Sequence, residues 1–140
     1  MPGLVGIIDY NQNPSVNDTI RRMVNVLNHT SPHVEEICKT NNAALAVLRR
    51  ESDYMPNSVI EDEDVIFAFW GHLFDKEDLI KKAGMEFNPA ESISIGHLLL
   101  NLYKNEGLSG YDRLNGRFII AVWDKKEKRL HLISDRYGFC

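Results

Sequence analysis

Few side chains in this sequence have the chemistry of a nucleophile or a metal ligand. The chain contains two cysteines, Cys38 and Cys140, which form no CxxC pair and so give no support to a zinc site. Cys38 is a candidate nucleophile, with His29 or His33 as the base that would activate it. The stretch around it is polar and lacks the strand-turn-helix pattern that presents a catalytic nucleophile. We therefore interpret Cys38 as an ordinary free thiol.

Pro2 is a second candidate, because an N-terminal proline carries a secondary amine. Tautomerases that use an N-terminal proline act through this amine, and removal of Met1 would expose it here. A proline is also common at the beginning of an edge strand, where its missing N–H is harmless. The structural interpretation of Pro2 is the simpler of the two.

Arg49 and Arg50 are the candidate anion-binding residues. A guanidinium group can hold a carboxylate through two parallel hydrogen bonds, but an arginine paired with an acid of its own chain has only a structural role. His72 is interpreted as a surface or pocket-wall residue rather than as a base. The aromatic residues are interpreted as core rather than as a ligand cage; they are Phe67, Phe69, Trp70, Phe118 and Trp123.

These residues must be positioned by the elements of one domain, since 140 residues suit a single domain that spans positions 1–140. Short runs rich in Val, Ile and aromatic residues predict its strands. The segment from Glu51 to Asp64 is polar and contains proline, which predicts a loop or a hairpin tip. The charged turn from Lys125 to Lys128 predicts a hairpin between the last two strands. The predicted strands are Gly3–Asp9, Ala43–Leu48, Val65–Trp70, Arg117–Asp124 and Arg129–Ser134.

Helices lie between these strands. Apolar residues at spacings of three and four predict a helix from Val16 to Asn28. Asp75 is the predicted cap of a short helix that runs to Ala83, and a longer helix begins near Pro89 and ends at Gly107. Hairpins on both sides of a pair of helices predict an α+β layered fold with mostly antiparallel sheets.

The composition excludes several classes of partner. With 44% hydrophobic and 26% charged residues and a net charge of -4, the chain has the make-up of an ordinary globular domain. No basic stripe suggests a nucleic acid partner. No apolar run approaches the roughly 18 residues of a membrane span, so we expect no membrane partner. The N-terminus lacks the basic and long apolar segments of a signal peptide, which predicts a cytoplasmic location.

Three stretches match the motifs of one known family in order and in spacing. The opening Met1–Asp9, MPGLVGIID, corresponds to Met-Cys-Gly-Ile-Val-Gly. Phe67–Asp75, FAFWGHLFD, corresponds to a strand that ends in Asn-Gly-Glu-Ile-Tyr-Asn. The most specific stretch is Leu114–Asp124, LNGRFIIAVWD, which continues to Ser134–Gly138 and matches Leu-x-Gly-x-Phe-Ala-x-x-x-Trp-Asp followed by Arg-Asp-x-x-Gly. On these motifs the chain resembles the class II glutamine amidotransferase domain, of the Ntn-hydrolase type, that opens asparagine synthetases.

The resemblance implies the fold of that family, an αββα sandwich of two mostly antiparallel sheets flanked by helices. In this fold we expect Gly3–Asp9 to be a central strand next to Arg117–Asp124. Both runs are apolar on both faces, as strands covered by other layers should be.

The resemblance also implies where glutaminase chemistry would lie. The family attacks glutamine with the side chain of its second residue, and the freed α-amine takes the proton. That residue is Pro2 here, which has neither a thiol nor a hydroxyl. The oxyanion hole, which the family builds from an Asn side chain and the N–H of the following Gly, falls on Trp70 and Gly71. We therefore expect no catalytic residue.

The glutamine pocket is expected only as a vestige. The arginine that holds the substrate carboxylate corresponds to Arg49. The acid that holds the substrate ammonium group corresponds to Ile95, which cannot bind a cation, and a following Glu corresponds to His97. The vestigial pocket that the resemblance implies contains no metal and consists of Arg49, Gly71, His72 and Ile95.

The implied function is that of a degenerate domain of asparagine biosynthesis, without glutaminase activity, that acts as a scaffold for an ATP-dependent, amide-forming synthetase domain in cis or in trans. ATP and Mg would belong to that domain. No Ser-Gly-Gly-x-Asp-Ser pyrophosphate loop occurs here, so we expect no cofactor in this chain. Two alternatives stay open, a hydrolase with an altered nucleophile and a free-standing binding module.

The last predicted strand leads to an expectation about self-association. The family continues into another strand after the Arg-Asp-x-x-Gly motif, whereas this sequence ends at Cys140. We expect Arg129–Ser134 to be an unpaired edge that leaves Leu130, Leu132 and Ile133 exposed. Such an edge invites pairing with a second copy, most simply as a two-fold homodimer.

Overall fold

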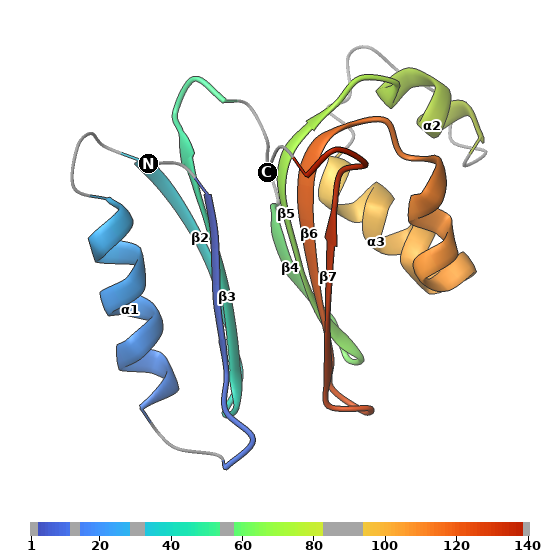
Figure 1. Ribbon diagram of the computed structural model, residues 1–140. Helices are drawn as coiled ribbons and strands as arrows, with labels where there is room; N and C mark the ends of the chain where they lie inside the picture. Colours follow the sequence, from blue (N-terminus) through green and yellow to red (C-terminus); the bar gives the residue numbers. More distant parts are fainter. Residues whose placement is uncertain (1–2, 12–14, 29–32, 54–57, 83–93, 139–140) are drawn as a thin grey trace.

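The computed structural model describes residues 3–11, 15–28, 33–53, 58–82 and 94–138. Figure 1 shows four layers: a helix, two sheets that face each other, and a second layer of helices. Every pair of neighbouring strands in the described ranges is antiparallel. The predicted α+β class and the αββα sandwich are therefore confirmed.

The first sheet has three strands in the order β1-β3-β2. They are β1 (Gly3–Ile8), β2 (His33–Lys39) and β3 (Ala43–Arg50). The helix α1 (Val16–Leu27) covers the outer face of this sheet with its apolar stripe (Figure 1). The helix begins at the residue that the sequence predicts and ends one residue earlier.

The second sheet has four strands in the order β4-β5-β6-β7. They are β4 (Val59–Glu61), β5 (Val65–Leu73), β6 (Gly116–Asp124) and β7 (Arg129–Ser134). β6 and β7 form the predicted hairpin. β7 lies at the edge of this sheet, as the sequence predicts for the last strand.

Helices cover the outer face of the second sheet. They are α2 (Lys76–Lys82), α3 (Ile95–Glu106) and the short 3-10 helix η1 (Gly107–Arg113) that follows α3. Within the described ranges no helix is long and apolar enough to cross a membrane.

The ends of α3 have clear local causes. Ser94 is the N-cap, and its hydroxyl accepts a hydrogen bond from the backbone N–H of His97 at 3.4 Å. Gly107 ends the helix with a φ of 65°, at the residue predicted from the sequence. The predicted start near Pro89 and the predicted end of the preceding helix at Ala83 lie outside the described residues.

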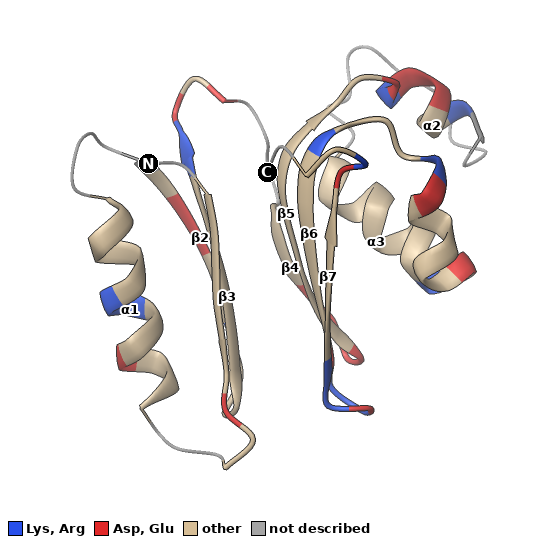
Figure 2. Cartoon of the chain, viewed as in Figure 1, with Lys and Arg blue, Asp and Glu red and all other residues tan. Residues whose placement is uncertain are grey.

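Alternate strand residues point to opposite faces, which divides the core into three layers. In β3, Leu45 and Val47 face the second sheet, whereas Ala46 and Leu48 face α1. Figure 2 shows that the strands are mostly uncharged, with an acidic band in β2. The inner layer, between the sheets, is built from Ala43, Leu45, Val47, Ile66, Ala68, Ala121 and Trp123.

The expectation that Gly3–Asp9 is central and lies next to Arg117–Asp124 is wrong. β1 is an edge strand of the first sheet and, among the described residues, pairs with β3, with Gly3 opposite Leu48. β6 belongs to the other sheet. An apolar run shows that a strand is covered above and below, and α1 and the facing sheet supply that cover even at an edge. The run carries no information about which strands flank it.

Two strands lie where the sequence predicts none. β2 is obscured by the adjacent Glu35 and Glu36, of which the first is exposed and the second is half-buried. β4 lies within Glu51–Asp64, where a loop is predicted, and its three residues are too few to show a periodic pattern.

Two glycines let β5 and β6 approach each other closely. Gly71 has a φ of 136°, and a Cβ at this position would lie 2.2 Å from the carbonyl oxygen of Arg117. Gly116 lies opposite Leu73 in the same strand pair, and a Cβ there would lie 2.2 Å from the carbonyl oxygen of His72. Backbone atoms cannot move aside as the end of a flexible side chain can, so both positions require glycine.

We expect Gly71→Ala to lower the free energy of unfolding by about 2–4 kcal/mol, because a backbone clash is added to an unfavourable φ. Urea unfolding followed by circular dichroism measures the difference. Gly3→Ala is the control, since a Cβ there meets nothing within 4 Å and should change stability by no more than about 0.5 kcal/mol. Equal stabilities of the two variants would contradict the constraint.

Candidate functional site

Three of the residues that the resemblance assigns to the site, Arg49, Trp70 and Gly71, lie near one end of the sandwich. Trp70 and Gly71 lie near the end of β5, and Arg49 is the last residue but one of β3. Figure 1 shows that both strands run to the same end, the upper one in this view. β1 begins there too, because Gly3 lies opposite Leu48 of β3. Pro2, at the nucleophile position, lies outside the described residues.

Trp70 occupies space between the two sheets. It is half-buried and packs against the inner core layer, on the same face of β5 as Ile66 and Ala68. Its register partner on β6 is Ile119. The resemblance assigns an oxyanion donor to this position, and the structure places a bulky indole there that packs against the core.

Arg49 contacts an acid of its own chain. Its Nε lies 3.4 Å from Oε1 of Glu36 on the neighbouring strand β2, and its guanidinium donates to the carbonyl oxygen of Asp53 at 3.2 Å. Of the two interpretations of Arg49, these contacts favour the structural one. Glu36 has no distinctive signal in the sequence apart from its place in the alternation of β2, which the adjacent Glu35 obscures.

Ile95 packs on the other side of the second sheet. It lies in the first turn of α3 and is half-buried against the core between that helix and the sheet, which contains Phe67 and Leu99. Trp70 packs on the opposite face of the same sheet. The structure therefore places Ile95 and Trp70 in different layers of the core.

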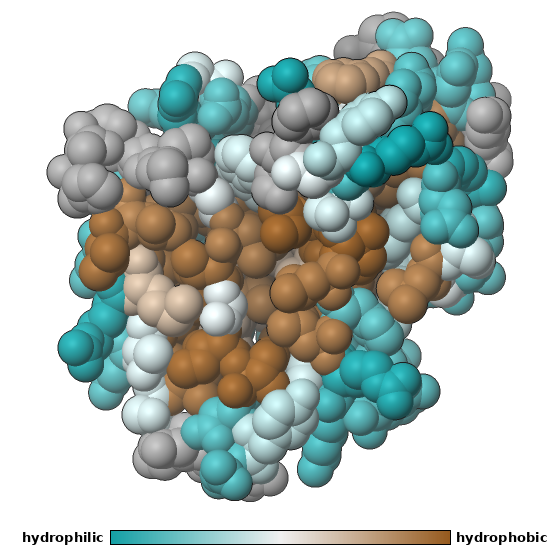
Figure 3. Space-filling model, viewed as in Figure 1, coloured by the Kyte–Doolittle hydropathy of each residue, from teal (hydrophilic) through white to brown (hydrophobic). Residues whose placement is uncertain are grey.

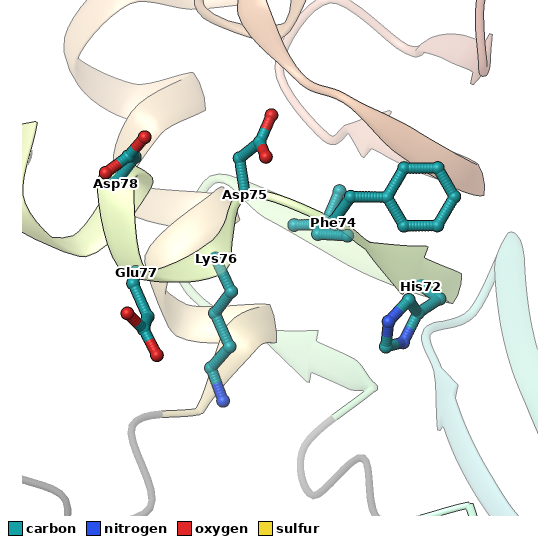
Figure 4. Close-up of a pocket in the computed structure, with 7 residues that line it drawn as sticks. His72, Phe74, Asp75, Lys76, Glu77 and Asp78 are labelled. Carbon is teal, nitrogen blue, oxygen red and sulfur yellow. The ribbon is translucent and has the colours of Figure 1, made fainter.

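His72 lines an open pocket of about 480 Å³ that is formed by seven consecutive residues. In Figure 4, His72, Lys76 and Glu77 point to one side of the ribbon, whereas Asp75 and Asp78 point to the other. Polar groups that diverge in this way do not converge on one substrate atom. In the part of the chain that the structure describes, no cluster of His, Cys, Asp and Glu side chains could hold a metal ion.

Cys38 is held as a thiol rather than a thiolate. Its Sγ donates to Oε2 of Glu61 at 3.0 Å, from β2 of one sheet to β4 of the other. Burial, followed by the hydrogen bond and the charge of Glu61, raises the pKa of the thiol from 9.0 to about 12. A nucleophilic cysteine needs surroundings that lower this pKa. Of its candidate bases, His29 and the side chain of His33 lie outside the described residues.

We expect Cys38 to react with iodoacetamide at pH 8 at least about tenfold more slowly in the folded chain than in urea, because the thiolate is the reactive form. Peptide mass spectrometry separates Cys38 from Cys140. Glu61→Gln should speed up the labelling, since it removes the charge that helps to hold the proton. Labelling of folded Cys38 at the rate of the unfolded chain would contradict the assignment.

The raised pKa of the Cys38 thiol makes the stability of the fold depend on pH. The unfolded thiol releases its proton above about pH 9, whereas the folded one keeps it, so this contribution to stability is intact below pH 9 and is lost as the pH rises towards 12.

Comparison with known proteins identifies the family. A family model described as a glutamine amidotransferase domain matches residues 1–140. The chain is similar to glutamine-hydrolyzing asparagine synthetase 2 of Bacillus subtilis (strain 168), with 25% identity over 145 residues that cover 99% of this chain and 19% of the relative. Its identity to glutamine-hydrolyzing asparagine synthetase 3 of the same organism is 28% over 145 residues, covering 99% of this chain and 24% of the relative. The chain thus spans about a fifth to a quarter of the length of these curated relatives. On the match over its whole length, the chain belongs to the glutamine amidotransferase domain family.

Proposed function

We propose that this domain lacks glutaminase activity and acts as a scaffold for an ATP-dependent, amide-forming synthetase domain, in the same chain or in another. The observation that carries the proposal is the proline at position 2, where the family resemblance calls for a nucleophile. The relatives are named as glutamine-hydrolyzing asparagine synthetases, and the match covers 19% and 24% of two of them. Most of their length lies outside the amidotransferase domain, which leaves room for a synthetase domain.

The chemistry of acyl transfer supports the loss of activity. Attack on the carboxamide carbon of glutamine needs a side-chain nucleophile at position 2, and Pro2 has none. Loss of one oxyanion donor, as at Trp70, costs on the order of 10²–10³ in rate. The side chain of Ile95 has no carboxylate that could bind the substrate ammonium group. Three such losses indicate a pocket that is filled rather than one that is retuned for another reaction.

The vestigial pocket that we propose has no catalytic residue, and the resemblance assigns to it Arg49, Gly71, His72 and Ile95, of which Ile95 packs on the opposite face of the second sheet from Trp70. ATP and Mg would be bound by the synthetase domain, so no cofactor is proposed for this chain. A cytoplasmic location belongs to the same proposal, because the reaction that the partner domain would carry out consumes ATP.

We expect the purified chain to release no glutamate from glutamine above the rate in buffer, measured with a coupled glutamate dehydrogenase assay. Diazo-oxo-norleucine, which alkylates the nucleophile of active glutaminases, should leave residue 2 unlabelled. Pro2→Cys should also be inactive, because Trp70 and Ile95 still occupy the oxyanion and ammonium positions. Glutamate release that disappears in Cys38→Ala would instead establish a hydrolase with an altered nucleophile.

The free edge of the second sheet supports a further part of the proposal, a homodimer. β7 is an edge strand, and its Leu132 is 62% exposed. Figure 3 shows apolar side chains gathered on this face of the molecule, over β1 and β7. Leu130 and Ile133 are half-buried, so Leu132 is the exposed apolar side chain of this strand. Among the described residues β7 pairs with β6, and an edge strand with an exposed apolar side chain favours pairing with another chain.

We expect the isolated chain to sediment as a dimer at micromolar concentration, and Leu132→Lys to shift it to a monomer, because a charge on the edge opposes strand pairing. Val26→Lys is the matched control, since Val26 is 71% exposed but lies on α1, on the far side of the first sheet (Figure 1). A wild-type monomer, or equal effects of the two substitutions, would contradict pairing through β7.

A further inference from the structure

Glu36 is an acidic residue within a mostly uncharged pair of sheets (Figure 2). Its side chain is 21% exposed. One carboxylate oxygen, Oε1, lies 3.4 Å from Nε of Arg49 on β3. The other, Oε2, accepts hydrogen bonds from the backbone N–H of Ser58 at 2.6 Å and of Val59 at 3.2 Å. Both oxygens therefore have donors, and the donors come from both sheets.

Each of the three donors belongs to a residue with a further contact besides the one to Glu36, which for Val59 is its pairing with Ala68 of β5. Arg49 is 15% exposed at its side chain, and its guanidinium also donates to the carbonyl oxygen of Asp53 at 3.2 Å. Ser58 is 1% exposed, and its carbonyl oxygen accepts a hydrogen bond from the N–H of Phe69 at 2.8 Å, which fixes the orientation of this segment on β5. A guanidinium beside two successive backbone N–H groups is a donor set that recognises a carboxylate.

We propose that Arg49 and the N–H groups of Ser58 and Val59 form a carboxylate-binding site that the chain fills with its own Glu36. This inference goes beyond the proposed loss of glutaminase activity, since it concerns what occupies the site and not which nucleophile is missing. A tethered ligand acts at an effective concentration of about millimolar or more. A dilute carboxylate in solution, including that of an amino acid, therefore does not displace Glu36.

Glu36 also ties the two sheets together. Its contacts join β2 and β3 of the first sheet to the start of β4 in the second. Removing its carboxylate leaves the N–H groups of Ser58 and Val59 without this acceptor and leaves the largely buried guanidinium of Arg49 without its acid, which is unfavourable for the folded state. A free carboxylate of the right size would relieve this, because the donors stay in position.

The test is a chemical rescue. Glu36→Ala deletes the atoms of an acetate ion, so sodium acetate is the probe, with sodium chloride at equal concentration as the reference. We expect the amide signals of Ser58 and Val59 to shift saturably with acetate in Glu36→Ala, with an affinity at least about tenfold higher than in the wild type. The thermal midpoint of the variant should rise with acetate, since the ligand binds only the folded state.

The matched control is Glu35→Ala, which deletes the same atoms from the next residue of β2. Glu35 is exposed, and its Oε1 accepts a hydrogen bond from the side chain of Asn28 at 2.8 Å. Acetate should neither bind nor stabilise this variant, and Glu36→Ala combined with Arg49→Met should lose the rescue.

Three results would overturn the proposal. The first is a folded Glu36→Ala whose Ser58 and Val59 signals do not respond to acetate. The second is a wild type that binds acetate at these residues as tightly as the variant does. The third is a Glu36→Ala chain that fails to fold even in acetate while Glu35→Ala folds normally. None of these measurements reads glutamate release, so this proposal and the loss of glutaminase activity can fail independently.

Discussion

The structure depends on the burial of β3 and β5 on both of their faces. Each strand lies in a sheet that has a helix on one side and the other sheet on the other (Figure 1). Residues Ala43–Leu48 and Val65–Phe69 are 3% exposed or less. Burial of apolar surface on this scale is the main favourable term in folding. A charged group on the inner faces therefore needs a charged or hydrogen-bonding partner, which explains why Glu36 and Arg49 contact each other.

The parts of the fold that could be predicted from the sequence are those with a local cause. The β6–β7 hairpin follows from two apolar runs and a charged turn, and Gly107 ends α3 because its backbone conformation suits glycine. Strand order has no such local cause, so the position of Gly3–Asp9 at an edge could not be seen. β2 could not be predicted for another reason. Glu36 breaks the expected alternation because it faces the interior, and the donors that allow this lie in other parts of the chain.

In the candidate site, too, the residue types can be read from the sequence, whereas their partners cannot. Arg49 and Cys38 could be recognised as candidates from their chemistry, but the choice between their interpretations depends on distant residues. Arg49 is paired by an acid 13 positions away, and Cys38 is kept protonated by burial and by Glu61, 23 positions away. Pro2 differs in this respect, because a proline has neither a thiol nor a hydroxyl whatever lies near it in the fold.

Gly71 illustrates why a matched motif does not imply retained chemistry. The family resemblance assigns its N–H to an oxyanion hole, yet packing alone requires glycine here, because a Cβ would lie 2.2 Å from the carbonyl oxygen of Arg117. Gly116, on the neighbouring strand β6, must be glycine for the same reason, because a Cβ there would lie 2.2 Å from the carbonyl oxygen of His72. The neighbouring Trp70 packs between the sheets, against the inner core layer. The glycine matched at position 71 is therefore accounted for by the packing of the β5–β6 pair alone.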